Sequence, residues 1–236
     1  MVLAVVLAAV FVRLGFWQLD RRAERRARND WVRRQLARPP ASYVDLVRHS
    51  AVSAESTRLV VDSANAPWHR HVSVVGSPDF DHEFVVTGRS NNGSPGVHIF
   101  TPVRVEGVPR AVLVNRGWVY APDAATIDLT RWREDRRTFT GYTAQIPWGH
   151  TISAVKGRTI RPLLYNGVLR VLPYQAEGLY VIARDSATNA TPVRLPEPDL
   201  SDGPHLSYAI QWFCFAAIAL IGAGIVLARS RQSRAG

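Results

Sequence analysis

The stretch that decides the fold is LSYAIQWFCFAAIALIGAGIVLA at residues 206–228, which contains no charged side chain. At 1.5 Å per residue a helix of this length spans about 34 Å, enough to cross a hydrocarbon core of roughly 30 Å. Acidic residues precede the stretch at 197–202, and arginines follow it directly. Because cytoplasmic flanks of membrane helices are rich in arginine and lysine, we predict a transmembrane helix over 205–228 and a basic cytoplasmic tail over 229–236.

A second apolar run opens the chain. Residues 1–12 are apolar, Arg13 interrupts them, and apolar residues resume as far as Leu19. A helix over 1–12 alone would span only about 18 Å. We therefore expect a first transmembrane helix over 1–19, with Arg13 extended toward the interface or paired. No basic residue precedes the run, so we expect this helix to be N-terminally incomplete, with a cleaved signal peptide as the alternative.

The formal net charge is +10, and arginines are densest just after the first apolar run. No aromatic side chains interleave them, so we expect no nucleic acid and name membrane lipids as their partner. We expect residues 20–38 to continue the first helix as a stem that Pro39 and Pro40 end. This orientation places the arginines outside the cytoplasm, although arginine usually lies on the cytoplasmic side of a membrane helix. We base the orientation on the charged residues on either side of the second helix, because their asymmetry is sharper. The arginines are Arg21, Arg22, Arg25, Arg26 and Arg28.

Short alternating segments with turn residues between them fill the middle of the chain, which is typical of an antiparallel barrel or sandwich. The predicted fold class is a membrane-anchored α+β protein: two transmembrane helices flank an antiparallel β-rich extracytoplasmic domain at 20–204, with a β core at about 68–185. The single cysteine, Cys214, leaves no intrachain disulfide. A short helix is predicted at 43–48, and strands at 69–76, 83–87, 97–105, 111–115, 138–145, 168–172 and 179–184.

Five sequence blocks occur in order between and within the two apolar segments. They are LGFWQLDR at 14–21, Trp68 with VSVVG at 72–76, GRS at 88–90 with GSPGVHIFTP at 93–102, VLVNRGWV at 112–119, and HLSYAIQWF at 205–213. Together these blocks resemble the surfeit-locus-one family of cytochrome c oxidase assembly factors. Asn115 stands where many members of that family have aspartate.

The resemblance implies a multi-pass protein of the cell (plasma) membrane that assists assembly of a haem–copper cytochrome c oxidase and is not an enzyme. It implies the oxidase catalytic subunit as partner, with haem a synthase as an additional candidate, and haem a as a transient cofactor. No nucleophile elbow, phosphate-binding loop, dinucleotide fingerprint or zinc spacing is present in the sequence. The alternatives are a haem-independent scaffold of the oxidase and a two-helix extracytoplasmic sensor.

His205 is the sharpest candidate for a haem iron ligand. Pro204 places it in the first turn of the last helix, where the partial positive charge disfavours a protonated imidazole. A neutral imidazole can bind iron. Helical spacing sets Tyr208, Ala209 and Trp212 on the same side, where a flat macrocycle could lie. The alternative is an interfacial histidine hydrogen-bonded to the domain, and the family resemblance favours the iron ligand.

Arg89, Arg116 and Trp118 form a second candidate set. They could make a basic and aromatic rim that binds haem propionates or the client subunit. The alternative, which the residues alone favour, places Trp118 in the core and lets Arg116 bond to a turn.

Metal binding is the third hypothesis considered. His69, His71, His82 and Glu83 could resemble a metal cluster, but we expect solvated surface there. Copper delivery normally needs thiolate or thioether ligands, and the only candidates are Cys214 in the membrane span and Met1.

Overall fold

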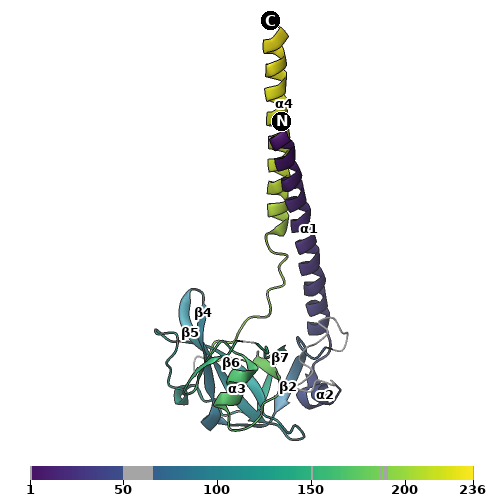
Figure 1. The fold of residues 1–236 in the computed structure, drawn as a ribbon. Coiled ribbons are helices and arrows are strands. Elements are labelled where there is room, and N and C mark those ends of the chain that lie inside the picture. Colours follow the sequence, from purple (N-terminus) through teal and green to yellow (C-terminus); the bar gives the residue numbers. More distant parts are fainter. Residues whose placement is uncertain (1, 50–65, 150, 187, 189–190, 236) are drawn as a thin grey trace. The chain divides into compact units, whose positions relative to one another are not determined.

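The computed structural model describes residues 2–49, 66–149, 151–186, 188 and 191–235 (Figure 1). The chain divides into two compact units. One unit joins the two ends of the chain, up to Arg33 and from Asp199, and the other comprises residues 34–198. We call them the helical unit and the β domain and describe each by itself.

The helical unit contains the two helices that are long and apolar enough to cross a membrane, α1 (Val2–Leu36) and α4 (His205–Ala235). The α1 helix runs without a break through the arginine-rich segment and ends shortly before Pro39, as the absence of an N–H on proline requires. The stem therefore belongs to the same helix as the apolar run.

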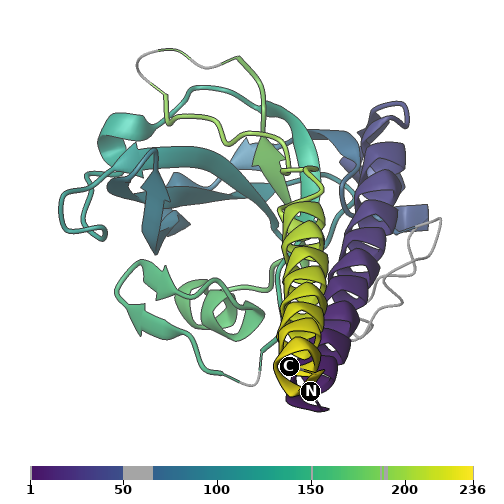
Figure 2. The ribbon, with the colours of Figure 1, turned by 90° about the horizontal axis from the view of Figure 1, so that it is seen from above.

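Figures 1 and 2 both draw α1 and α4 side by side. Phe11 of α1 stacks on Trp212 of α4, with ring centroids 5.7 Å apart. A Cβ added to Gly15 would lie 2.5 Å from the Phe213 ring, so a glycine is needed for this close approach. Between Ala4 and Asn29, one row of buried or half-buried α1 residues recurs at alternating intervals of four and three, the spacing of a left-handed helix pair. They are Ala4, Ala8, Phe11, Gly15, Gln18, Arg22, Arg25 and Asn29, which we call the α1 stripe.

The β domain is built on one large mixed sheet. Its strands are β1 (Ala41–Ser42), β2 (His71–Val75), β3 (Ser77–Pro78), β4 (Phe84–Asn91), β5 (Ser94–Arg104), β6 (Val112–Tyr120), β7 (Thr138–Gln145), β8 (Ala154–Lys156), β9 (Thr159–Arg161) and β10 (Leu179–Ala183). Their order is β1-β2-β7-β10-β6-β5-β4-β9-β8, and β3 pairs with β5. The domain also has short helices α2 (Tyr43–His49), η2 (Phe80–His82), η3 (Thr130–Trp132) and α3 (Tyr165–Val171).

The expectation of an antiparallel sheet is confirmed in part, because six of the nine strand pairs in the described residues are antiparallel. The pairs β1–β2, β10–β6 and β4–β9 are parallel. Parallel neighbours need a crossover connection, and α3 lies within the segment that joins β9 to β10. The strand that we predicted at 168–172 is part of α3, because an apolar run this short does not distinguish a strand from a buried helix.

Hydrophobic clusters cover both faces of this sheet. One cluster combines Tyr43 and Leu46 of α2 with β-strand side chains such as Val112 and Val181. The other combines Tyr165 and Val168 of α3 with side chains that include Leu113, which alternates with Val112 and therefore points to the opposite face. The sheet thus lies between α2 on one face and α3 on the other.

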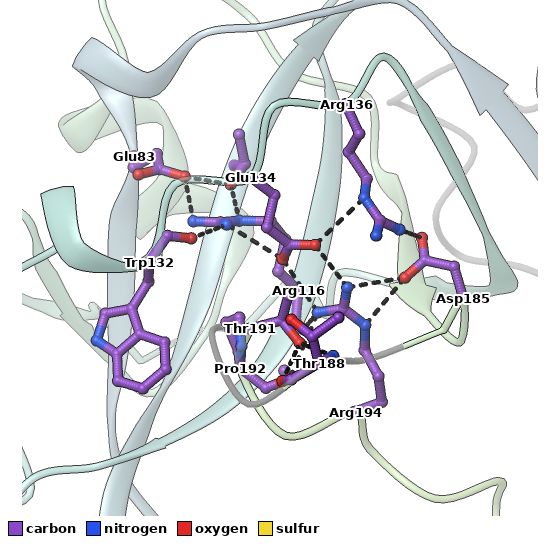
Figure 3. A network of polar contacts seen from close by, with 12 residues as sticks. Glu83, Arg116, Trp132, Glu134, Arg136, Asp185, Thr188, Thr191, Pro192 and Arg194 are labelled. Atoms are coloured by element: carbon purple, nitrogen blue, oxygen red, sulfur yellow. Dashed lines mark hydrogen bonds and ion pairs between the residues drawn. The ribbon is translucent and has the colours of Figure 1, made fainter.

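A buried network of ion pairs lies inside the β domain (Figure 3). The fully buried Arg116 binds Glu83 Oε1 at 2.6 Å, Thr101 Oγ1 at 2.7 Å and Glu134 Oε1 at 3.3 Å. Glu134 in turn binds Arg194 at 2.7 Å. Arg136 and Asp185 complete the network, so three guanidinium groups face three carboxylates. Each buried charge therefore has a partner, as its desolvation demands.

We predict that Arg116→Leu destabilises the protein by about 3–5 kcal/mol, because it leaves the carboxylate of Glu83 buried without its cation. Thermal unfolding in detergent measures this. The control is Arg131→Leu, since Arg131 is exposed and forms no ion pair among the described residues. The double variant Glu83→Leu/Arg116→Leu removes both charges and is expected to recover part of the loss. Equal melting temperatures for Arg116→Leu and Arg131→Leu would contradict this account.

Candidate functional site

His205 is the first residue of α4 and pairs with a residue of α1. The Tyr208 amide donates to the Pro204 carbonyl at 3.1 Å, which closes the first turn of the helix. Nδ1 of His205 lies 2.9 Å from Oε1 of Gln18. Because a carboxamide oxygen only accepts hydrogen bonds, Nδ1 carries a proton and donates it to Gln18. In the described parts of the chain no group bonds Nε2, and His205 is partly exposed. The structure therefore offers an imidazole with one orientation, whose Nε2 has no partner among the described residues.

The position of Gln18 follows from the α1 stripe. Gln18 comes three residues after Gly15, the point of closest approach between the helices, and so faces α4. Sequence reasoning missed Gln18 as a functional residue. Gln18 is a polar residue three positions after Gly15 within the block at 14–21, and this spacing could have indicated that it faces the other helix.

His205, Ala209 and Trp212 share the face of α4 that contacts α1, and Tyr208 does not. Ala209 is 1% exposed, and Trp212 stacks on Phe11, so both belong to the contact with α1. Tyr208 is 46% exposed and points away from that contact. Beside Ala209, where we expected room for a flat macrocycle, the structure places α1. The sequence of α4 alone carries no information about what packs on it.

The arginine-rich part of α1 binds the segment 199–202 that leads into α4. Arg22 and Arg26 share one carboxylate, that of Asp202, at 3.2 and 2.7 Å. Further along the helix, side chains of α1 donate to backbone carbonyls of the segment. These contacts are Arg25 Nε to Ser201 O at 2.9 Å, Asn29 Nδ2 to Ser201 O at 2.9 Å and Arg33 to Leu200 O at 3.0 Å. We call this set of contacts the linker clasp, and it brings the chain back to α1 just before His205.

Comparison with known proteins gives the family. A profile described as the SURF1 family matches residues 5–217, a span that contains Gln18, the linker clasp and His205. The chain belongs to the SURF1 family. This family is known for cytochrome oxidase assembly factors, so the resemblance to surfeit-locus-one proteins is confirmed.

The similar curated proteins are mycobacterial. Uncharacterised SURF1-like proteins of Mycobacterium bovis and of two strains of Mycobacterium tuberculosis are each 27% identical over 231 residues. Each alignment covers 91% of this chain and 76% of the relative. Together with the family match over residues 5–217, this similarity includes the β domain, nearly all of α1 and the start of α4 in this SURF1-family protein.

The arginine cluster has intramolecular partners that we did not expect. Of the five arginines assigned to lipid, Arg22, Arg25 and Arg26 bind the linker and Arg21 pairs with Glu24. The lipid contact remains a prediction for Arg28. From the sequence we interpreted Asp202 only as part of the acidic segment before the second helix. Its partners Arg22 and Arg26 lie more than 170 residues away in the sequence, so the pairing could not be predicted.

Arg116 and Trp118 do not form an exposed rim. Arg116 is fully buried in the ion-pair network, and Trp118 is 8% exposed. Burial of both agrees with the structural alternative, except that Arg116 bonds mainly to carboxylates rather than to a turn. The pairing of Arg116 with Glu83 and Glu134 was not predicted, because the sequence does not reveal that these glutamates are buried beside it.

The histidine-rich region holds no metal cluster within the described residues. The expectation of solvated surface is wrong for Glu83, which is fully buried beside Arg116. His82 instead bonds Asp79 Oδ2 at 2.8 Å, and Tyr174 donates to the same oxygen at 2.6 Å. These side chains form a small polar cluster at the start of β4.

We predict that Asp202→Asn loosens the linker clasp, because the asparagine carries no charge for Arg22 and Arg26. A spin label at position 200, in a Cys214→Ser background, should become more mobile by electron paramagnetic resonance. Asp20→Asn is the control, since Asp20 is exposed and forms no ion pair among the described residues. An unchanged spectrum for Asp202→Asn would contradict the clasp.

The same label tests the pH dependence of the clasp. The hydrogen bond from Arg26, aided by the charges of Arg26 and Arg22, holds the pKa of Asp202 below its ordinary value. A depressed carboxylate pKa means that the contact is fully formed above the ordinary aspartate pKa and is lost as the pH falls through the lowered value. We therefore expect the wild-type label to stay immobile at the pH where a free aspartate is half protonated, and to be released only in stronger acid.

Proposed function

We propose that this SURF1-family protein assists assembly of a haem–copper cytochrome c oxidase by holding haem a transiently at His205. The partners in this proposal are the catalytic subunit of the oxidase, as the recipient, and haem a synthase, as the source. The observation that carries it is the hydrogen bond between His205 Nδ1 and Gln18 Oε1. The haem a would supply an iron centre whose coordination is completed by the protein.

The His205–Gln18 pair fits the requirements of an iron ligand. Histidine ligands almost always donate their second ring N–H to an oxygen, which fixes the tautomer and the ring orientation. Gln18 supplies such an oxygen at 2.9 Å from Nδ1, so Nε2 would be the nitrogen that binds iron. Being a carboxamide, it adds no charge of its own at the membrane boundary. The arrangement orients the imidazole without the help of a buried carboxylate.

The charges near His205 suit a ligand with propionates. Arg22 lies four residues beyond Gln18 on the α1 stripe, and Arg22 and Arg26 together face one carboxylate. One positive charge there is uncompensated by Asp202 and can pair with an anionic group. The apolar tail of haem a would have the hydrocarbon region next to it. This combination favours haem a over a ligand that is polar throughout.

We further propose that the β domain lies outside the cytoplasm and that both helices span the cell membrane. The basic end of α4 supports this orientation. The arginines that follow the first span would favour the cytoplasmic side. Their positive charge is partly neutralised, however, because Asp199 and Asp202 pair with Arg22, Arg25 and Arg26.

The test is to purify the protein from cells that make haem a and to record its visible spectrum. We expect a Soret band that His205→Ala abolishes. Gln18→Leu should weaken haem affinity by about 10- to 100-fold, the range for loss of a residue that orients a metal ligand. Gln211→Leu is the matched control, because Gln211 is an exposed glutamine on the same helix as His205.

Two outcomes would overturn the proposal. A Soret band that survives His205→Ala would place the haem elsewhere. No band in the wild type would favour a haem-independent scaffold of the oxidase. If deletion of the gene also left oxidase content and activity normal, a function in oxidase assembly would be excluded. The sensor function would then be the better hypothesis.

A further inference from the structure

A β-bulge in β4 directs Arg89 to one particular face of the sheet. Val86 pairs with His98, and Arg89 pairs with Gly96, so two residues of β4 lie opposite one residue of β5. Side chains alternate along a strand, so Arg89, three residues after Val86, would otherwise point to the opposite face. The extra residue returns it to the side of Val86 and His98. Gly88 permits the bulge with a φ of +68°.

A second bulge has the same effect on β6. Asn115 pairs with Phe100 and Gly117 with Ile99, which makes Arg116 the extra residue. The Gly117 amide donates to Asn115 Oδ1 at 3.0 Å, and Gly117 has a φ of +127°. Asn115 and Trp118 therefore share a face although they are three residues apart. Because Trp118 pairs with His98, this is the face of Arg89.

Tyr180 of β10 joins the same face. Ile182 is in register with Asn115, and Tyr180 lies two residues away on the same side of its strand. Its ring contacts that of Phe100, with centroids 5.4 Å apart. We call Arg89, His98, Asn115, Trp118 and Tyr180 the donor face.

The polar groups of the donor face are set up to donate hydrogen bonds. Asn115 uses its oxygen for the Gly117 amide, so its Nδ2, 3.4 Å away, donates to Nδ1 of His98. His98 must then carry its hydrogen on Nε2. Burial, reinforced by the charge of Arg89, lowers the pKa of His98 to about 4, so this imidazole is neutral. Burial also raises the pKa of Tyr180, against the opposing charge of Arg89, and keeps its hydroxyl protonated.

The positive charge of the donor face has no partner in the described chain. Arg89 forms no ion pair there, and its Nε atom is buried without a hydrogen bond. Trp118 Nε1 is also buried without a hydrogen bond. The guanidinium of Arg161, itself without an ion pair among these residues, lies over Gly88, 2.8 Å from where a Cβ would be. A buried guanidinium or N–H group without a hydrogen bond raises the free energy of the folded state. Most buried donors in folded proteins have a partner, so these unpaired donors indicate a partner from outside the chain.

We propose that the donor face binds a carboxylate group of a ligand, with Arg89 and His98 Nε2–H as its hydrogen-bond donors. A carboxylate matches the planar fork of a guanidinium and can accept from two donors at once. It also supplies the negative charge that the described residues around Arg89 lack. The proposal stands independently of haem binding at His205. The carboxylate can be a porphyrin propionate or an acidic group of a protein.

The test uses the full chain in nanodiscs with ¹⁵N-labelled histidine, and His98→Gln assigns the His98 signals. Benzoate should shift these signals saturably, and its neutral isostere benzamide should bind at least tenfold more weakly. Arg89→Gln should weaken benzoate at least tenfold, and Arg89→Lys, which keeps the charge but not the fork, should lie in between. Arg131→Gln is the matched control and should change nothing. His205→Ala should bind benzoate like wild type, which separates this site from the haem proposal.

Competition identifies the source of the carboxylate. Displacement of benzoate by metal-free mesoporphyrin IX, and not by its dimethyl ester, would indicate a propionate. Displacement by an acidic peptide, and not by its amidated form, would indicate a protein carboxylate. Equal binding of benzoate and benzamide, or equal behaviour of Arg89→Gln and Arg131→Gln, would overturn the proposal. If neither competitor displaces benzoate, benzoate is an adventitious additive only, and this outcome would also overturn the proposal.

Discussion

The side chains that α1 buries recur every three or four residues, and their chemistry changes at Gln18. Before that point Ala8 is buried, Phe11 stacks on Trp212 and Gly15 lies against Phe213, so the contact with α4 is apolar. After it, the same stripe holds arginines and Asn29, which bind the linker. Gln18 lies at the change and meets His205. One helical repeat therefore fixes the helix pair, the return of the linker and the orientation of the candidate ligand.

In the β domain, the bulge at Arg116 in β6 likewise determines the position of several side chains. Arg116 is the extra residue of β6, and its side chain is held by Glu83, Thr101 and Glu134 on one side of the sheet. That anchor fixes the position of the bulge, and the bulge in turn directs Asn115 and Trp118 to the other side. The block at 112–119 thus contains a structural residue and two residues of the donor face. Loss of the Arg116 network would disturb both.

Elements that depend on local pattern could be predicted from the sequence. The two apolar helices follow from long uncharged runs, and the strand at 138–145 from alternation bounded by turns. Features that depend on distant pairing could not. His205 and Gln18 are 187 residues apart, and the parallel pairing of β10 with β6 follows from the crossover through α3. The ion pairs of Arg116 could not be predicted either, because nothing near it in sequence indicates two buried glutamates. Family blocks identified the protein, but not which of their residues face a ligand.

In the helix pair, the hydrogen bond to Gln18 orients the imidazole of His205 and leaves Nε2 without a partner among the described residues. Solid-state ¹⁵N NMR of labelled histidine in lipid bilayers, with His205 assigned by its substitution, tests this most directly. The account predicts a protonated Nδ1 whose hydrogen bond reaches the Gln18 carboxamide, and a Nε2 with the chemical shift of an unprotonated nitrogen. A protonated Nε2, or an Nδ1 without contact to Gln18, would contradict it.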